Sequence, residues 1–198
     1  MQDEATPASA IPDSRIITGD RPEAVVAAER LPVVLVLDRL RSAFNVGNIF
    51  RLADAVGAAE VITCGYTAAP PHPKLEKTAR GCDVIVPTRR AESAEEAVAE
   101  LKARGCTVYA VETAASATTV WETTLRFPAA FVLGNEALGV SGGALALCDG
   151  IVRLPCRGVK NSVNVGNCAA VVLYEALRQW LDGRRDAGFT DTPQTPEL

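Results

Sequence analysis

Three short segments of the chain concentrate the residues that could bind a ligand or do chemistry: residues 44–51, 133–139 and 154–169. Each segment begins where an apolar run ends, and each is rich in Gly, Asn and Ser. These residues tolerate unusual backbone angles, offer hydrogen bonds and cap helices. Open α/β sheets bind their ligands at loops beyond the carboxyl ends of the strands. The three segments therefore predict one polar site assembled from loops at successive strand ends.

Several common chemistries lack their residues in this sequence. No Gly-x-Gly-x-x-Gly follows the first apolar run, and no Gly-x-x-x-x-Gly-Lys-Ser/Thr loop is present. His72 is the single histidine and lies in a Pro-rich loop, which disfavours His-dependent hydrolysis and histidine-rich metal sites. The six cysteines are far apart in the sequence and predict reduced core thiols. We expect no metal.

The three segments, in this order and spacing, resemble the signature motifs of the SpoU (TrmH-like) branch of the SPOUT RNA methyltransferases. The first motif matches at Asn45, Gly47 and Arg51, and the second matches at Gly134, Glu136 and Gly139. The third motif matches at the following residues: Pro155, Gly158, Ser162, Asn164 and Val165. The resemblance extends from about Leu31 to Trp180. It departs from the family pattern at Cys156, Val163, Gly166 and Asn167.

The resemblance implies S-adenosylmethionine as the cofactor and methyl transfer to a ribose 2′-hydroxyl of RNA as the reaction. An adenine ring needs an apolar slot with free backbone groups, and loops that leave buried strands supply both. By resemblance, the cofactor-binding residues are Thr113, Gly134, Asn135, Leu154, Pro155, Gly158 and Val163.

The resemblance also implies which residues act in catalysis. Arg51 would handle the 2′-hydroxyl. Its guanidinium has a pKa above roughly 12, so we favour positioning and charge stabilisation over deprotonation. Asn45 would hold Arg51 or the RNA backbone, and Glu136 would anchor that arginine or a neighbouring loop N–H. Ser162 and Asn164 precede the last helix, where capping is a sufficient structural reason for both.

The net charge of −4 argues against a general nucleic-acid binder, so any attraction to RNA must be local. The candidate RNA-binding residues are Arg41, Lys74, Lys77 and Arg80. The resemblance implies a homodimer with the last helix at the interface, and it leaves open whether the two subunits share the active site. Many members of the resembled family that modify rRNA carry an extra N-terminal RNA-binding domain. Here about thirty residues precede the core, and we therefore favour tRNA over rRNA as the substrate. Two alternatives remain: a non-catalytic RNA- or nucleotide-binding module, and an unrelated α/β enzyme with a nucleotide cofactor.

These loops require a scaffold of alternating strands and helices. Apolar runs predict strands at 33–37, 60–64, 84–86, 108–111, 130–133 and 151–154. Helical spacing predicts helices at 45–56, 93–104, 141–147 and 165–181, with a helical turn at 74–80. The alternation predicts an α/β fold with a mostly parallel sheet and helices on both faces. A C-terminal deep trefoil knot, as in the SPOUT fold, is implied by the resemblance alone.

The outer segments have a different composition from the core. We predict an N-terminal arm at residues 1–30, with a short helix at 21–30. The methyltransferase domain is expected at residues 31–182, and a flexible tail at residues 183–198. No apolar run approaches the roughly 18–20 residues of a membrane span. The N-terminus lacks a basic start and an apolar stretch, so we expect no signal peptide and a cytoplasmic enzyme.

Overall fold

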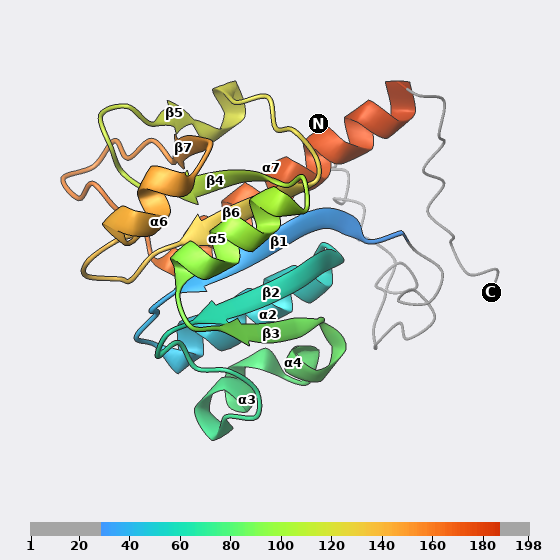
Figure 1. Cartoon of the computed structure of the whole chain (residues 1–198), viewed down its shortest axis with the longest axis vertical. Helices are drawn as coiled ribbons and strands as arrows, with labels where there is room; N and C mark the ends of the chain where they lie inside the picture. The colour runs from blue at the N-terminus through green and yellow to red at the C-terminus, as the bar shows by residue number, and fades with distance from the viewer. Residues whose placement is uncertain (1–28, 187–198) are drawn as a thin grey trace, which may run out of the picture.

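A computed structural model describes residues 29–186 of the chain, and these residues form a layered α/β fold (Figure 1). Seven strands make one sheet in the order β3-β2-β1-β6-β4-β7-β5. Every pairing between these strands is parallel. The predicted fold class, a mostly parallel sheet covered by helices, is confirmed for this part of the chain.

The elements alternate along the sequence as predicted in most places. The strands are β1 (Leu31–Asp38), β2 (Ala58–Cys64), β3 (Thr88–Ala91), β4 (Thr107–Val111), β5 (Thr118–Thr119), β6 (Ala129–Leu133) and β7 (Gly150–Arg153). The helices are α2 (Ala43–Ala55), α3 (Pro73–Ala79), α4 (Cys82–Ile85), α5 (Ala94–Ala103), α6 (Gly142–Leu147) and α7 (Val165–Asp186), with a 3-10 turn η2 (Val120–Glu122). No helix within residues 29–186 has the length and apolar character needed to cross a membrane.

Side chains on the two faces of the central strand β1 enter two separate cores. Leu35 and its alternate neighbours pack with α2, α3 and α7, whereas Val36 and its alternate neighbours pack with α5 and α6. Successive side chains of a strand point to opposite faces, so a strand covered on both sides reads as a continuous apolar run. In Figure 1, α5 and α6 cover the near face of the sheet and α2 lies behind it.

Gly47 shows why one glycine of the first segment has a packing role. It lies in α2 where that helix crosses α3. A Cβ atom at this position would come within 2.0 Å of Thr78 Oγ1 and 2.6 Å of the Leu75 carbonyl oxygen. The absence of a side chain therefore allows α2 to approach α3 closely, at the end of α2 that carries Asn45.

Two predictions are wrong: the strand at 84–86 and the end of the last helix. Residues 84–86 were predicted as a strand, but they lie in and directly after α4, and the strand of this region is β3. β3 is a polar edge strand with only Ala91 buried, so it carries no apolar signal. Helix α7 continues to Asp186 rather than ending at residue 181, so the predicted tail boundary at 183 falls within a helix. The predicted arm helix at 21–30 lies almost entirely outside the described residues.

Candidate functional site

A cavity of about 480 Å³ lies at the carboxyl edge of the sheet, beyond the ends of β4, β6 and β7. Its wall combines apolar side chains such as Leu133 and Leu154 with polar residues of the loops that follow these strands. Among the residues predicted for the site, those that line the cavity are Thr113, Gly134, Asn135, Glu136, Leu154, Ser162, Val163 and Asn164. The fold therefore brings the second and third segments together around one cavity.

A chain of hydrogen bonds joins all three segments beside this cavity. The side-chain amide of Asn45 donates to Glu136 Oε1 at 2.9 Å. The Oδ1 atom of Asn45 accepts from Asn164 Nδ2 at 3.2 Å. The Oδ1 atom of Asn164 also accepts from the Gly166 N–H at 2.9 Å, at the start of α7. Asn45 is thus the link between segments that are about a hundred residues apart.

Glu136 is held as a carboxylate by this arrangement. Its Oε2 accepts from the Arg41 N–H at 2.8 Å, and its Oε1 accepts from the Ser42 N–H at 3.1 Å. Desolvation would raise the pKa of Glu136, but the hydrogen bonds from Arg41, Asn45 and Ser42 together outweigh it and hold the pKa below its ordinary value. The prediction left two partners open for Glu136, and the structure selects the neighbouring loop N–H groups over Arg51.

The second segment is a tight loop whose shape is set by a glycine. A Cβ atom on Gly134 would lie 2.2 Å from the Val140 nitrogen, so no other residue fits without moving the loop. Across the loop, Asn135 and Gly139 exchange two backbone hydrogen bonds of 3.0 and 2.8 Å. Glu112, just after β4, accepts from the Val140 N–H at 3.0 Å. Glu112 also lines the cavity, and the sequence reasoning missed it.

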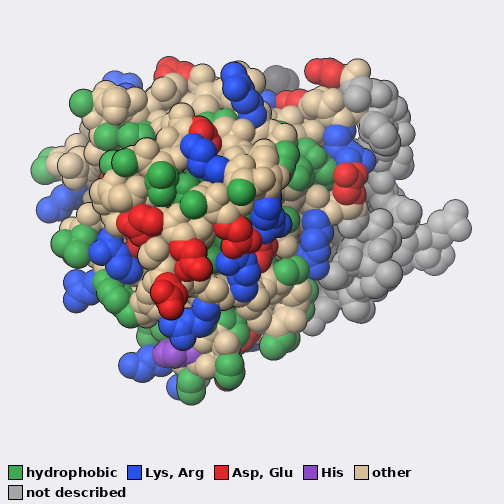
Figure 2. All heavy atoms as spheres, viewed as in Figure 1, with side chains coloured by type: hydrophobic (Ala, Val, Ile, Leu, Met, Phe, Trp, Pro, Cys, Tyr) green, Lys and Arg blue, Asp and Glu red, His purple; other side chains and the backbone are tan. Residues whose placement is uncertain are grey.

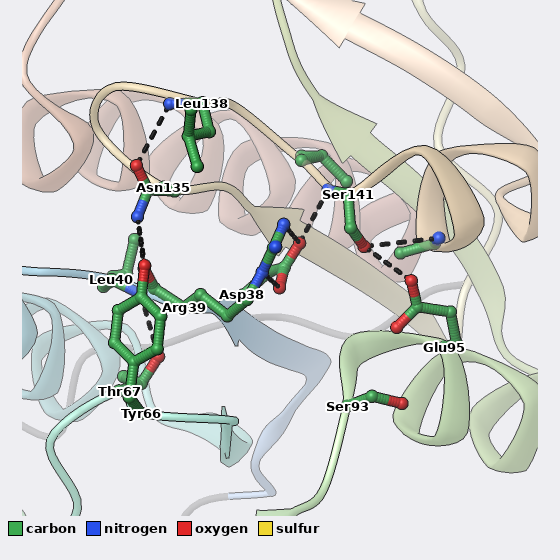
Figure 3. Close-up of polar contacts among 12 residues, drawn as sticks. Asp38, Arg39, Leu40, Tyr66, Thr67, Ser93, Glu95, Asn135, Leu138 and Ser141 are labelled. Carbon is green, nitrogen blue, oxygen red and sulfur yellow. Dashed lines mark hydrogen bonds and ion pairs between the residues drawn. The ribbon is translucent and has the colours of Figure 1, made fainter.

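Asn135 is buried, and its side-chain amide is used within the protein. Its Nδ2 donates to the Arg39 carbonyl at 2.7 Å and to the Tyr66 hydroxyl at 2.8 Å. Its Oδ1 accepts from the N–H groups of Ala137 and Leu138. Figure 3 shows this amide lying between the loop after β1 and its own loop. Asn135 therefore shapes the cavity wall, and its predicted role as a direct cofactor ligand stays a prediction.

A second set of polar contacts holds the far end of the same loop (Figure 3). Asp38, the last residue of β1, is 1% exposed and accepts from the Ser141 N–H at 2.7 Å and from Arg39 Nε at 2.9 Å. The Ser141 hydroxyl pairs with Glu95 Oε1 at 2.8 Å. Residues 139–143 also fit a Gly-x-Ser-x-Gly pattern, but His72 is not among the hydrogen-bond partners of Ser141.

Sequence reasoning missed Asp38 and Glu112, although a signal for them exists. Each is a carboxylate at the point where a buried strand ends, and each accepts a hydrogen bond from a loop N–H group, Val140 for Glu112 and Ser141 for Asp38. A charged side chain at the end of an apolar run is costly to bury unless it accepts hydrogen bonds. Such carboxylates are therefore candidates for holding a loop at the carboxyl edge.

Arg51 does not join the cluster within one chain. It is exposed on α2 and is not part of the cavity wall. It follows Asn45 by six residues, which places it about 9 Å further along the helix axis. The alternative in which Asn45 holds Arg51 is absent, because the Asn45 side chain pairs with Glu136 and Asn164. The role of Arg51 stays a prediction.

Two residues of the third segment also lie away from the cavity. Pro155 and Gly158 belong to the loop after β7 and are exposed. A Cβ atom on Gly158 would meet no other atom within 4 Å. Their assignment as cofactor ligands therefore has no support from the geometry of the wall. Ser162 lines the cavity, whereas only Asn164 makes a capping hydrogen bond to the first turn of α7.

The predicted RNA-binding residues divide into two groups. Arg41 and Lys74 line a second cavity, beside the start of α2. Lys77 and Arg80 are exposed at the end of α3 and do not line it. Figure 2 shows Lys and Arg side chains intermixed with Asp and Glu on the visible face, so no continuous basic surface covers that side.

The cysteine thiols are free, and several are chemically quiet. Burial raises the pKa of Cys64 to about 12 and that of Cys148 to about 11. Cys64 and Cys106 are buried, and the other four cysteines are partly buried, so the core location is confirmed for two of the six, and their reduced state stays a prediction. Within residues 29–186, no group of three or more His, Cys, Asp or Glu residues is placed to hold a metal ion.

The chain is similar to known proteins in both sequence and fold. Residues 32–174 match the model of the SpoU rRNA methylase family. The chain is 36% identical over 179 residues to the tRNA (guanosine(18)-2′-O)-methyltransferase of Thermus thermophilus, which covers 90% of this chain and 89% of that protein. It is 33% identical over 165 residues to the 23S rRNA (uridine(2479)-2′-O)-methyltransferase of Streptomyces viridochromogenes, covering 79% of this chain and 58% of that protein. The solved structure of the SpoU methyltransferase AviRb from that organism, in complex with AdoMet, aligns with a TM-score of 0.71 at 28% identity, over 84% of this chain and 67% of that one.

Proposed function

The chain belongs to the SpoU rRNA methylase family, and on this premise we propose that it transfers a methyl group from S-adenosylmethionine to a ribose 2′-hydroxyl of RNA. One observation carries the proposal. The three segments that resemble the family motifs meet in the hydrogen-bonded cluster of Glu136, Asn45 and Asn164, at the edge of a ligand-sized cavity.

The cavity fits the cofactor in size and chemistry. Its volume of about 480 Å³ is within the range of small-molecule sites, roughly 300–1,000 Å³. Leu133, Leu154 and Val163 offer an apolar wall for the adenine, and the loop backbones offer polar groups for its edge. When bound, the cofactor supplies an electrophilic methyl group. The chain's own residues would hold it and exclude water, while Ser162 and Asn164 face the same cavity from the third segment.

The reacting hydroxyl must be placed in line with the methyl group, and its developing charge must be stabilised. We assign both tasks to Arg51, in a homodimer in which Arg51 of one chain serves the cavity of the other. Two observations support this arrangement: Arg51 lies outside its own cavity, and α7 exposes the apolar side chains of Val171 and Tyr174. The second copy would cover that face of α7.

We further propose that the C-terminal segment forms the deep trefoil knot of the SPOUT fold. The chain leaves β7, which pairs with β4 and β5, and returns to pack α7 against α2 and β1. The return path, residues 154–164, runs along the cavity, and its Asn161 carbonyl accepts from the Thr113 hydroxyl at 3.3 Å. Because residues 154–164 run along the loops of the cavity before α7 begins, this path supports a fold in which α7 is threaded through those loops.

For the substrate we favour tRNA, in the cytoplasm, over rRNA. The relative that acts on tRNA matches over nearly the full length of both chains, whereas the relative that acts on rRNA has a large part beyond the match. The domain at 31–182, extended to the end of α7 at Asp186, would then be the catalytic unit.

One assay tests the proposal against its alternative, a non-catalytic RNA- or nucleotide-binding module. The full chain is incubated with methyl-labelled S-adenosylmethionine and with unmodified tRNA or rRNA, and the labelled nucleotide is mapped. Label in a ribose 2′-O-methyl group of tRNA supports the proposal. Binding of both molecules without label transfer would support the binding module, and label in a base would exclude 2′-O chemistry.

A further inference from the structure

A second cavity, distinct from the cofactor cavity, lies where α2 begins and where the loop after β2 leads into α3. It has a volume of about 560 Å³. We refer to it as the aromatic-basic pocket, after the side chains in its wall: Arg41, Phe44, Tyr66, His72, Lys74 and Arg90. Figure 2 shows Lys and Arg side chains beside the histidine, which is drawn in purple.

Two aromatic rings of this pocket are unusually exposed. The exposed fraction is 54% for Phe44 and 61% for Tyr66. Buried aromatic rings dominate protein cores, so rings left in water next to cations resemble the surfaces on which single-stranded nucleic acids stack their bases. Phe44 directly precedes Asn45, so the pocket begins one residue from the cluster that joins the three segments.

The Tyr66 ring is held rather than loose. Its hydroxyl accepts a hydrogen bond of 2.8 Å from Asn135 Nδ2. The next residue, Thr67, is buried and bonds through its hydroxyl to the Leu37 carbonyl and to the Leu40 N–H, both at 2.9 Å. A fixed ring costs little conformational entropy when a base stacks on it. Because Asn135 also lines the cofactor cavity, one side chain connects the two cavities.

The positive charges of the pocket are not neutralised by ion pairs within the described part of the chain. Arg41, Lys74 and Arg90 form no ion pair within residues 29–186, whereas the neighbouring Arg89 pairs with Glu60 and Glu100. Arg90 donates to the Gly65 carbonyl at 2.9 Å, which orients it along the loop that carries Tyr66. In a chain with a net charge of −4, such a group of unpaired cations favours an anionic ligand at this place.

We propose that the aromatic-basic pocket binds an unstacked nucleotide of the RNA substrate, adjacent to the nucleotide that is methylated. Its base contacts the rings of Phe44 and Tyr66, and its phosphates contact Arg41, Lys74 and Arg90. The inference rests on the proposed RNA substrate. It makes the pocket a determinant of substrate choice, since a nucleotide held in a duplex stack cannot place its base there.

The test uses the full chain and a single-stranded uridine decamer with one central 2-aminopurine, whose fluorescence falls when it stacks on an aromatic ring. Wild-type protein should quench the probe. Phe44→Ala and Tyr66→Ala should each remove most of the quenching and weaken decamer binding about tenfold, as expected for the loss of one base–aromatic stack. Both rings are exposed, so both variants should fold, and Phe44→Ala should leave cofactor affinity unchanged in calorimetry. Tyr66→Ala also loses the hydrogen bond to Asn135, so its reference is Tyr66→Phe, which loses that bond but keeps the ring and should quench as wild type does.

Trp121→Ala is the matched control, because Trp121 is also 54% exposed but lies in η2, outside the pocket. It should leave the quenching unchanged. Equal quenching by wild type and by both pocket variants would overturn the inference, and so would a loss of dimer in those variants, because the pocket would then be a subunit interface.

Methyl transfer to tRNA separates this inference from the proposed function. If the probe is quenched through Phe44 and Tyr66 but no methyl group is transferred, the proposed activity is refuted and nucleotide binding in the pocket is supported. If methyl transfer proceeds with an unchanged KM for tRNA in both pocket variants, nucleotide binding in the pocket is refuted and the proposed activity is supported. The expected result is a KM that rises several-fold with a smaller change in kcat.

Discussion

Replacing Glu136 with Gln tests whether this carboxylate holds the loops of the site together. The carboxylate accepts three hydrogen bonds, of 2.8 Å from Arg41 N–H, 3.1 Å from Ser42 N–H and 2.9 Å from Asn45 Nδ2. Glutamine is nearly isosteric, but it turns an NH2 group towards at least one of these donors. Two N–H groups then face each other without an acceptor.

The size of the effect follows from these hydrogen bonds. Hydrogen bonds to a charged group contribute about 1.5–3 kcal/mol each when water is excluded. Glu136 is exposed, so water replaces part of the loss, and we expect a decrease of about 2 kcal/mol in the free energy of unfolding. For a chain of this size that decrease corresponds to about 4–8 °C in Tm. Methyl transfer should fall more steeply, because Asn45 loses the partner that orients it.

The stability difference should depend on pH in a defined direction. The pKa of Glu136 is lowered in the folded protein, so its contribution is fully present above its ordinary pKa in the unfolded chain. The contribution is lost as the pH falls through the lower folded value. Calorimetric Tm values of wild type and Glu136→Gln should therefore differ at pH 7, and the difference should shrink as the pH falls below the ordinary glutamate pKa of about 4.3.

Glu122→Gln is the control, because Glu122 is exposed in η2 and makes no side-chain hydrogen bond or ion pair among the described residues. It should unfold at the wild-type temperature at every pH. A Glu136→Gln protein with unchanged Tm at pH 7, or with a deficit that persists at low pH, would refute the role of the carboxylate.

Three further expectations follow from the site. Arg51→Ala should abolish methyl transfer and leave cofactor affinity unchanged in calorimetry, because Arg51 is assigned to the RNA hydroxyl and not to the cofactor; a mutant that keeps most of its activity would contradict this. Gly134→Ala should lower stability by about 1–3 kcal/mol and weaken cofactor binding, since its Cβ would lie 2.2 Å from the Val140 nitrogen; normal melting and affinity would show that the loop is adaptable. Charge reversal at Lys74, Lys77 and Arg80 should weaken RNA binding. The slope of log affinity against log salt should also become less steep, by about 0.7 for each phosphate of a single strand that the protein no longer neutralises; an unchanged slope would show that these three side chains only form a solvated surface.

Local pattern was sufficient to predict most of the scaffold. A strand buried on both faces has to be apolar throughout, and an amphipathic helix has to repeat its apolar residues every three or four positions. The runs that became β1, β2, β4, β6 and β7 carry the first signal, and α5 carries the second together with a capping serine at position 93. The pattern failed for β3 and β5, because short edge strands need no apolar face.

The order, type and spacing of the polar residues were sufficient to predict the family and part of the cavity wall. They also placed Glu136, Ser162 and Asn164 in one region, which the cavity confirms. Their partners could not be predicted in the same way. The Asn45–Glu136 and Asn45–Asn164 hydrogen bonds join residues 91 and 119 positions apart, and no local pattern encodes such a distance.

The sequence by itself determined the apolar strands of the sheet and the loops that carry the polar residues, because local sterics and burial act within a few residues. The order and spacing of those polar residues determined the family. The tertiary structure alone decided the strand order, with β6 inserted between β1 and β4, and so which loops became neighbours. It recruited Asp38 and Glu112 to hold the second segment. It also placed Tyr66 against Asn135 and separated Arg51 from the cavity, because interactions between distant segments form only when the whole sheet is assembled.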